Sequence, residues 1–443
     1  MDIEFTDKIE SYTEGFKQLK ENKFRDNPEW LRQLRECASR EFSTLGFPTL
    51  RDEDWRFTNL APIARNKFHI VDAGEEKLDR KKIDELSIPN IEAVKLVFIN
   101  GHYSAEFSDN EKLPDEVIVS SLRDALKQNE NTVSEYLGKF ALYEKQSFIA
   151  LNTTLFEDGL FIYVPKSVLV DKPIYALFIS TEEDVQSIVN QRNLVIAADN
   201  SELKVIEHYV STSHNVHFSN VVTEAYAGEN CNLEHYMLEF ESRKAFNIST
   251  LRVEQKRNSN IKSHSVLLGG SLVRNNVHPV LGGEGSHSLI NGLYMSTDRQ
   301  HMDNFMRVEH ASPHCDSRQF YNGVLDKKSK GVFHGRIVVH ENAAKTDAKQ
   351  TNKNLLLTDT AQIDTKPQLE IYNEDVKCTH GATIGQMDDD AVFYLRSRGI
   401  PKRDAETIML RAFTGQSIAN MGLEPVRSYL EAKVDEWFIG RKN

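Results

Sequence analysis

A rhythm of turn residues through the middle of the chain constrains the fold more than any other feature. From about residue 156, short β-type runs alternate with turn pairs rich in Asn, Asp and Gly. The first pairs recur about every 25 to 30 residues and the later ones at about half that interval, a spacing typical of a β-solenoid, whose coils stack only on their neighbours. A β-sandwich also has short strands and regular turns, so it stays open as the alternative. The earlier pairs are Asp199-Asn200, Glu229-Asn230, Asn258-Ser259 and Glu284-Gly285, and the later ones are Glu341-Asn342, Asp359-Thr360 and Asn373-Glu374.

The segment before this region reads as mainly helical. Asn27-Pro28 suits the cap and first turn of a helix, and apolar residues that include Cys37 follow at helical spacing, so Cys37 is expected in the core. A further helix is expected over residues 121–143. The dipeptide Asn100-Gly101 lies between two β-type runs and predicts a hairpin with a type I′ turn.

Helical patterns return after the turn-rich region. Asp388 can cap a helix that Gly399 closes, and Pro401 prevents its continuation. Two more apolar stripes follow before residue 443. These stripes are more apolar than a short tail requires, so they must pack on the solenoid, on each other or on another protein.

The chain therefore divides into three expected parts. Residues 1–155 form a mainly helical N-terminal domain, residues 156–387 form the β-solenoid core, and residues 388–443 form a C-terminal helical domain. The fold class is mainly β with α.

Composition and missing motifs exclude several classes of protein. A net charge of −12 argues against a general nucleic-acid binder, and no apolar run is long enough to span a bilayer. The acidic start, residues 1–7, lacks the basic and apolar regions of a signal peptide, which predicts a cytoplasmic protein with reduced cysteines. There is no phosphate-binding loop, dinucleotide fingerprint, zinc-protease motif or nucleophile elbow. We therefore expect no enzymatic activity of the chain's own.

The most informative short stretch is Asp375–Thr383. Residues two apart on a strand point to the same face, so Cys378 and His380 would project side by side, about 6 to 7 Å apart at the backbone. A thiolate and an imidazole are suitable ligands for iron or zinc, but two ligands do not close a site. Val376 and Ala382 share the same parity, so Cys378 could instead fill the solenoid interior.

Other cysteines, histidines and glycines give weaker signals. His310, His314 and Cys315 form a second candidate group, although adjacent strand residues face opposite sides. Cys231 lies in a turn, where a structural or exposed thiol is expected. The glycine-rich runs at 269–270 and 282–285 precede no clear helix, so they read as solenoid turns and not as a phosphate cradle.

A long segment of the C-terminal half closely resembles the SufB/SufD family of iron–sulfur cluster assembly proteins. Weaker likeness extends upstream, for example at Glu53–Thr58 and Asp158-Gly159, so the resemblance covers most of the chain. The strongest stretches are Ser317–Gln319, Gly331–Gly335, Lys345–Asp347, Gln350–Leu357, Asp364–Tyr372, Lys377–Thr383 and Phe393–Ile400.

Two positions sort the chain between the branches of that family. B-type subunits carry a scaffold cysteine near the position of Asn352 and a glutamate at the position of Gly381. Both ligand-capable side chains are missing here, and the run Lys377–Gly381 resembles the D-type. The resemblance therefore shifts the main cluster-building role to a partner.

The resemblance also implies a fold and a set of partners. It implies a right-handed parallel β-helix flanked by helical domains, a heterodimer with the B-type subunit, and docking of an ABC-type ATPase subunit on the C-terminal helices. His380 and Cys378 become candidate interface ligands for iron or sulfur, with His380 the stronger of the two. Self-pairing of the isolated chain is a further expectation. The expected partner-binding residues are Phe393, Tyr394, Leu395, Arg396, Arg398, Met409 and Phe413.

The expected chemistry is transient. No intrinsic cofactor is expected; iron, sulfide or a nascent cluster would be held with the partner, and a flavin could join the complex. The implied function is that of a D-type scaffold partner in an ATPase-driven assembly complex, and a purely structural adaptor without ligands is the alternative. A polysaccharide-active β-helix enzyme is disfavoured because Asp388–Asp390 is better explained as a helix start.

Overall fold

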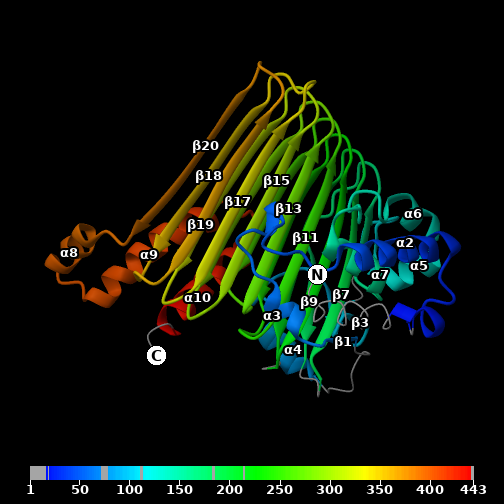
Figure 1. Ribbon diagram of the computed structural model, residues 1–443, viewed down its shortest axis with the longest axis horizontal. Helices are drawn as coiled ribbons and strands as arrows, with labels where there is room; N and C mark the ends of the chain where they lie inside the picture. The colour runs from blue at the N-terminus through cyan, green and yellow to red at the C-terminus, as the bar shows by residue number, and fades with distance from the viewer. Residues whose placement is uncertain are drawn as a thin grey trace.

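The protein is a two-sheet parallel β-solenoid with helices at both ends. The computed structural model describes residues 16–17, 19–70, 78–109, 113–181, 185–212 and 215–440. Odd-numbered strands from β5 onward build one sheet, here called sheet A, and even-numbered strands from β6 onward build sheet B (Figure 1). The chain thus passes from one sheet to the other at each corner, and the coils pair in parallel, which excludes the sandwich alternative.

The solenoid strands have similar lengths and stack in register. In sheet A they are β5 (Leu160–Val164), β7 (Ser187–Ala197), β9 (His217–Ala227), β11 (Phe246–Gln255), β13 (Leu272–Leu281), β15 (His301–His310), β17 (Lys330–Val339) and β19 (Gln362–Ile371). In sheet B they are β6 (Ile174–Ser180), β8 (Glu202–Ser211), β10 (Asn232–Phe240), β12 (Asn260–Leu267), β14 (His287–Ser296), β16 (Asp316–Leu325), β18 (Asp347–Leu356) and β20 (Lys377–Gln386). The expected β-helix core flanked by helices is confirmed.

The expected tightening of the later turns is wrong. Each coil has two corners, and the earlier turn pairs all belong to the corner that leads from sheet A to sheet B. Asp359-Thr360 lies at the opposite corner, between β18 and β19, so the apparent shortening came from counting both corners. The turn chemistry itself was correct, because Asn200, Asn230 and Asn258 all have positive φ, as does Gly285.

Alternation along each strand separates the interior from the outer face. In β15, Met302, Met306 and Val308 are buried between the sheets, whereas Arg307 and Glu309 lie on the outer face. The interior is a continuous apolar cluster that runs from the first coils to Phe333 and Leu325. Burial of this area is the main source of stability for such a fold.

Most of the N-terminal segment covers the outer face of sheet A, whereas residues 80–88 pack against sheet B through Ile83 and Ile88. Its helices pack on the first coils through a cluster that includes Phe148, Phe218 and Phe246. Its strands extend the sheets, and β2 and β3 form the expected hairpin, with positive φ at both Asn100 and Gly101. The elements are α2 (Glu29–Leu45), a 3-10 turn (Glu53–Trp55), α3 (Ala61–Arg65), β1 (His69–Ile70), α4 (Arg80–Leu86), β2 (Val94–Ile99), β3 (His102–Ser104), β4 (Ile118–Ser121), α5 (Leu122–Gln128), α6 (Glu130–Tyr136) and α7 (Ser147–Leu155).

The single helix expected over residues 121–143 is two short helices, α5 and α6, that end at Tyr136. The backbone then turns at Gly138, whose φ of +74° lies in the left-handed region that glycine adopts more readily than other residues. The N–H groups of Gly138, Phe140 and Ala141 all donate to the buried carboxylate of Glu224 on β9, at 2.8, 3.0 and 2.9 Å. A tertiary acceptor therefore replaces the helical carbonyls over this stretch.

Helix α2 begins at Glu29, and no side chain caps it, so the predicted capping role of Asn27 is wrong. Cys37 lies on this helix but is only half-buried, with its Sγ 3.1 Å from the guanidinium of Arg40. The buried stripe of α2 instead consists of Leu31, Arg35, Ala38 and Phe42.

The C-terminal helices cover the outer face of sheet B. They are α8 (Asp389–Ser397), α9 (Lys402–Ile418) and α10 (Glu424–Gly440), and Asp388 caps α8 as expected by accepting the Ala391 N–H at 3.0 Å. Leu410, Leu430 and Trp437 pack on sheet B in one apolar cluster. No helix of the described residues is long and apolar enough to cross a membrane.

Candidate functional site at the open end of the solenoid

The last coil leaves one end of the solenoid uncovered. Strands β19 and β20 are the terminal strands of sheets A and B, and each pairs on one side only within the described chain (Figure 1). Nine of the ten residues of β20 are exposed, whereas every residue of β7 near the other end is buried. An unpaired strand edge offers backbone N–H and C=O groups to another chain.

Cys378 and His380 both lie on β20. Their registers pair Cys378 with Ala348 and His380 with Gln350 on β18. Ala348 and Gln350 are buried inside the solenoid, so Cys378 and His380 share the parity of the interior side. The two predicted donors are therefore on one side of the final strand, at the mouth of the solenoid interior.

The two side chains differ in exposure. His380 is exposed, whereas Cys378 is half-buried against the apolar cluster of Ile337, Val339 and Ala348. Burial raises the pKa of the Cys378 thiol, so the sulfur is protonated at neutral pH and becomes a strong ligand only when a cation displaces the proton. The packed role considered for Cys378 thus has a structural basis in this cluster, and its ligand role stays a prediction.

Two neighbouring positions, one on β18 and one on β20, hold residues that cannot bind metal through a thiolate or a carboxylate. Asn352 is buried and its Nδ2 donates to the Tyr321 carbonyl at 3.2 Å, while its Oδ1 accepts from Asn354 at 2.6 Å. Gly381 has no atom within 4 Å of where a Cβ would lie, so space for a larger side chain exists there. Within the described ranges no group of three or more His, Cys, Asp or Glu side chains could hold a metal ion.

Sequence reasoning missed the amide groups beside His380. Gln350 lies level with His380 on β18, and its Nε2 donates to Gln319 on β16 at 2.9 Å, so an amide column leads inward from the open end. The Oε1 of Gln350 is buried and has no hydrogen-bond partner in the described chain. The sequence signal that could have found these amides is the constant coil length, because residues about thirty positions apart then share one register.

The predicted partner-binding residues lie on α8 and α9. Phe393 is 68% exposed and Tyr394 58% exposed, and Arg396 and Arg398 are exposed beside them. Figure 1 shows α8 standing away from the strands beyond β20. Leu395, Met409 and Phe413 are half-buried, and Phe413 packs against the cluster under α10. Two large aromatic side chains in water on one short helix are unusual for a monomer and typical of a binding surface.

The other candidate groups do not form sites. His310 is fully buried and its Nε2 bonds Ser317 Oγ at 2.8 Å, whereas His314 is an exposed corner residue with positive φ. Cys231 is buried, and burial raises its pKa to about 12, which makes it a structural thiol. The glycine runs at 269–270 and 282–285 lie at solenoid corners, as predicted.

Comparison with known proteins matches the solenoid and the segment before it. A family model described as the SufBD core domain of SUF-system FeS cluster assembly matches residues 178–413, and a model of the SufBD N-terminal region matches residues 6–176.

Individual relatives agree with the family models. An iron–sulfur cluster assembly SufBD family protein of Synechocystis is 31% identical, with 89% of this chain and 88% of the relative covered. The iron–sulfur cluster assembly protein SufD of Escherichia coli is 32% identical over 89% of this chain and 90% of its own length. SufD of Bacillus subtilis is 25% identical, with 92% and 94% covered.

Proposed function

Because the chain belongs to the SufBD family and functions in iron–sulfur cluster assembly, we propose that it is a D-type subunit that offers His380 and Cys378 to a site completed by a partner. The observation that carries the proposal is the position of both donors on the exposed final strand of an uncapped solenoid. Iron and sulfide are cargo at this site, not resident cofactors.

The proposed partner is a B-type subunit that pairs along the open end. The uncovered edges of β19 and β20 supply the backbone groups for such pairing, and the exposed apolar side chains Ile371, Tyr372 and Ile384 supply surface to bury. A second solenoid that ends in the same way would satisfy both requirements. The additional ligands that a four-coordinate metal site demands, a third and a fourth donor, would come from that partner or from sulfide.

The proposed source of nucleotide-driven movement is an ATPase subunit that docks on α8 and α9 through Phe393 and Tyr394. Because α9 packs on sheet B while α8 extends beyond it, movement of a bound partner can reach the last coils. Nucleotide would act by favouring one arrangement of the open end over another. In this proposal the chain performs no catalysis itself.

Gln350 gives His380 a defined role in the proposal. If the imidazole donates one N–H to the unpartnered Oε1 of Gln350, its other nitrogen is left free to bind metal. This arrangement is the usual way in which a second contact orients a histidine ligand.

The deciding experiment replaces His380 in the assembled complex. We expect His380→Ala to lower the iron and acid-labile sulfide retained by the anaerobically purified complex by about tenfold or more, since even outer contacts of metal ligands cost 10- to 100-fold in affinity. Subunit stoichiometry and melting temperature stay unchanged, because the side chain is exposed. His287→Ala, an exposed histidine at the start of β14 in the same sheet, is the matched control.

A structural adaptor is the second candidate, favoured by the missing third ligand and by the packing of Cys378 in an apolar cluster. Under this alternative His380→Ala and Cys378→Ala both retain the wild-type iron and sulfide content. That result would contradict the ligand role while leaving the docking role intact.

A further inference from the structure

The outer face of sheet A carries a column of basic side chains that runs from β11 to β17. Arg252 on β11 pairs in register with His278 on β13, and Arg307 on β15 pairs with Arg336 on β17. We call these four residues the basic column.

The register between β13 and β15 shows that the two pairs form one continuous column. Val277 pairs with Met306, and Val280 pairs with Glu309, so His278 lies level with Arg307. Neighbouring strands are about 4.8 Å apart, and like charges directly opposite each other are unfavourable. The column therefore concentrates positive charge that needs an acidic counterpart.

The available carboxylate is shared among several donors. Glu309 lies two residues after Arg307 on β15, on the same face of the strand. Its Oε1 is 2.8 Å from both the Arg307 Nε and the His278 Nε2, and its Oε2 is 3.2 Å from the His340 Nε2. Arg336 forms a separate ion pair with Asp54, at 3.0 Å. The single carboxylate of Glu309 thus offsets the positive charge of both His278 and Arg307.

Arg252 has no such partner. Within the described ranges it makes no ion pair and no hydrogen bond to an acidic group, although it is half-buried; Glu309 and Glu224 act on it only from a distance. Burial, and then the charge of Arg307, lower the pKa of Arg252 to about 10, which still leaves the guanidinium charged at neutral pH. A half-buried charge without a direct ion pair is less well stabilised than a paired one, which points to an anionic ligand.

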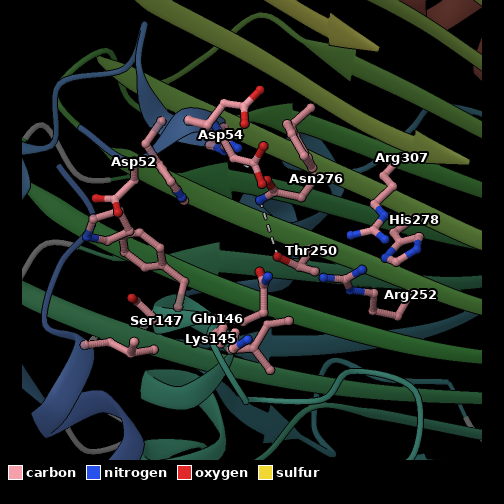
Figure 2. A pocket seen from close by; sticks show the side chains of 18 of the residues that line it. Asp52, Asp54, Lys145, Gln146, Ser147, Thr250, Arg252, Asn276, His278 and Arg307 are labelled. Carbon is pink, nitrogen blue, oxygen red and sulfur yellow. Dashed lines mark hydrogen bonds between the residues drawn. The ribbon is translucent and has the colours of Figure 1, made fainter. Parts of the chain in front are cut away.

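A cavity of about 330 Å³ opens beside this end of the column. Figure 2 shows Arg252, His278 and Arg307 gathered on one side of it, with Lys145, Gln146 and Ser147 below. The volume is at the lower end of the range for small-ligand sites.

The opposite wall is the N-terminus of α7. This helix begins at Ser147, and Gln146 at the cap position makes no side-chain cap hydrogen bond. The first N–H groups of a helix lack internal partners and carry positive partial charge, so they favour an anion. Lys145 precedes the helix and lines the same cavity.

The acidic residues of the cavity already have partners. Asp54 pairs with Arg336, and Glu53 pairs with Lys366 at 2.7 Å. Asp52 accepts the Thr49 N–H at 2.6 Å. In Figure 2, Asp52 and Asp54 lie away from Arg252.

We propose that this cavity binds a phosphate group, either as inorganic phosphate or as a phosphate monoester, between Arg252, Arg307 and the N-terminus of α7. Donors on two walls suit a tetrahedral oxyanion better than a planar carboxylate, and guanidinium groups match phosphate geometry. Because one wall is the solenoid and the other is the N-terminal segment, the bound anion bridges the two and stabilises their packing.

The test titrates the full chain with inorganic phosphate and, separately, with adenosine 5′-monophosphate, in phosphate-free buffer at constant ionic strength. Binding is followed by calorimetry and by the melting temperature. We expect saturable one-to-one binding and a rise in melting temperature for at least one probe. Preference for free phosphate or for the monoester identifies the source of the phosphate group.

Two variants and one control locate the site. We expect Arg252→Gln to weaken binding at least tenfold without lowering the melting temperature of the ligand-free protein, since it removes a half-buried charge that has no direct ion pair. Lys145→Gln, at an exposed position, should weaken binding severalfold. Arg243→Gln removes the same charge from a surface arginine paired with Asp298 and should leave the affinity unchanged.

The proposal is overturned by non-saturable binding of both probes. It is also overturned if Arg243→Gln weakens binding as much as Arg252→Gln, or if neither cavity variant changes the affinity.

Discussion

The two ends of the solenoid are built from the same kind of coil, but only the N-terminal end is covered by other parts of the chain. At the N-terminal end, β7 is buried throughout because the N-terminal helices cover its outer face and the next coil covers its edge. At the C-terminal end, β20 is exposed along almost its entire length. Each coil stacks only on its neighbours, so a terminal coil needs a cap or a partner. The candidate ligands lie at the end where this chain supplies neither.

The difference also shows where stability and function are separated. Interior residues of the middle coils gain stability from close packing, whereas the same positions in the last coil face solvent in the isolated chain. Residues at the open end are thus free to serve an interface at little cost to folding.

The largest expected effect compares isoleucine at two interior-side positions of sheet B. Ile290 on β14 is 1% exposed, whereas Ile384 on β20 is 52% exposed. We expect Ile290→Ala to lower the free energy of unfolding by about 2–5 kcal/mol through cavity formation, and Ile384→Ala to change it by less than about 0.5 kcal/mol.

Urea denaturation of the isolated variants measures both values. Association with the proposed B-type partner, followed by size-exclusion chromatography, should be weakened by Ile384→Ala. Equal destabilisation by the two variants would show that the last coil is not an open end.

The second prediction concerns a histidine on the covered part of sheet B. His208 on β8 is fully buried; its Nδ1 is 2.8 Å from the Tyr175 hydroxyl, and its Nε2 is 3.5 Å from that of Tyr429 on α10. Burial, with a smaller effect of Lys433, lowers the pKa of His208 to about 3. The unfolded chain takes up this proton near pH 6.5 and the folded protein does not, so stability falls as the pH drops below 6.5.

Between pH 6.5 and pH 5 this single group costs about 2 kcal/mol, at 1.36 kcal/mol per pH unit. We expect His208→Gln to remove that part of the pH dependence, as measured by urea denaturation at each pH. Above pH 8 the pH dependence of variant and wild type should coincide, which is the internal control. An unchanged slope between pH 6.5 and pH 5 would show that His208 takes up its proton in the folded state.

The smallest expected effect compares corner residues along the solenoid. In the early coils Asn200 and Asn230 occupy the left-handed corner position, and the Asn230 Nδ2 donates to the Asn200 Oδ1 at 3.0 Å. Near the open end the equivalent corner holds His314, with φ of 57°. Asparagine tolerates this conformation better than histidine, so we expect His314→Asn to stabilise the chain by up to about 1 kcal/mol.

Thermal unfolding measures the change, with His314→Ala as the control that lacks the local hydrogen bonds of asparagine. If His314→Asn melts no higher than His314→Ala, the corner conformation is not a source of strain.

Much of the architecture followed from local patterns. Turn pairs such as Asn230 and Asn258 mark corners because only a few residue types accept positive φ, and this requirement is visible in a few consecutive residues. The alternation around Cys378 and His380 predicted a shared face for the same reason, since side-chain direction on a strand has a period of two. The ends of α8 were equally local, being set by Asp388 and Gly399.

Other features depended on contacts between distant residues. The helix expected over 121–143 ends early because the carboxylate of Glu224, more than eighty residues away, accepts the N–H groups of Gly138 and its neighbours. The basic column combines Arg252 and Arg307 from different coils, which no short motif can reveal.

By itself the sequence determined the coil, its corners and the strand on which the candidate ligands lie, because backbone conformation and side-chain alternation are properties of neighbouring residues. Only the tertiary structure decided the register between coils, and therefore which side chains share a column and which coil remains uncovered. Stacking energy depends on all coils together, so residues about thirty positions apart become neighbours only when the chain has folded.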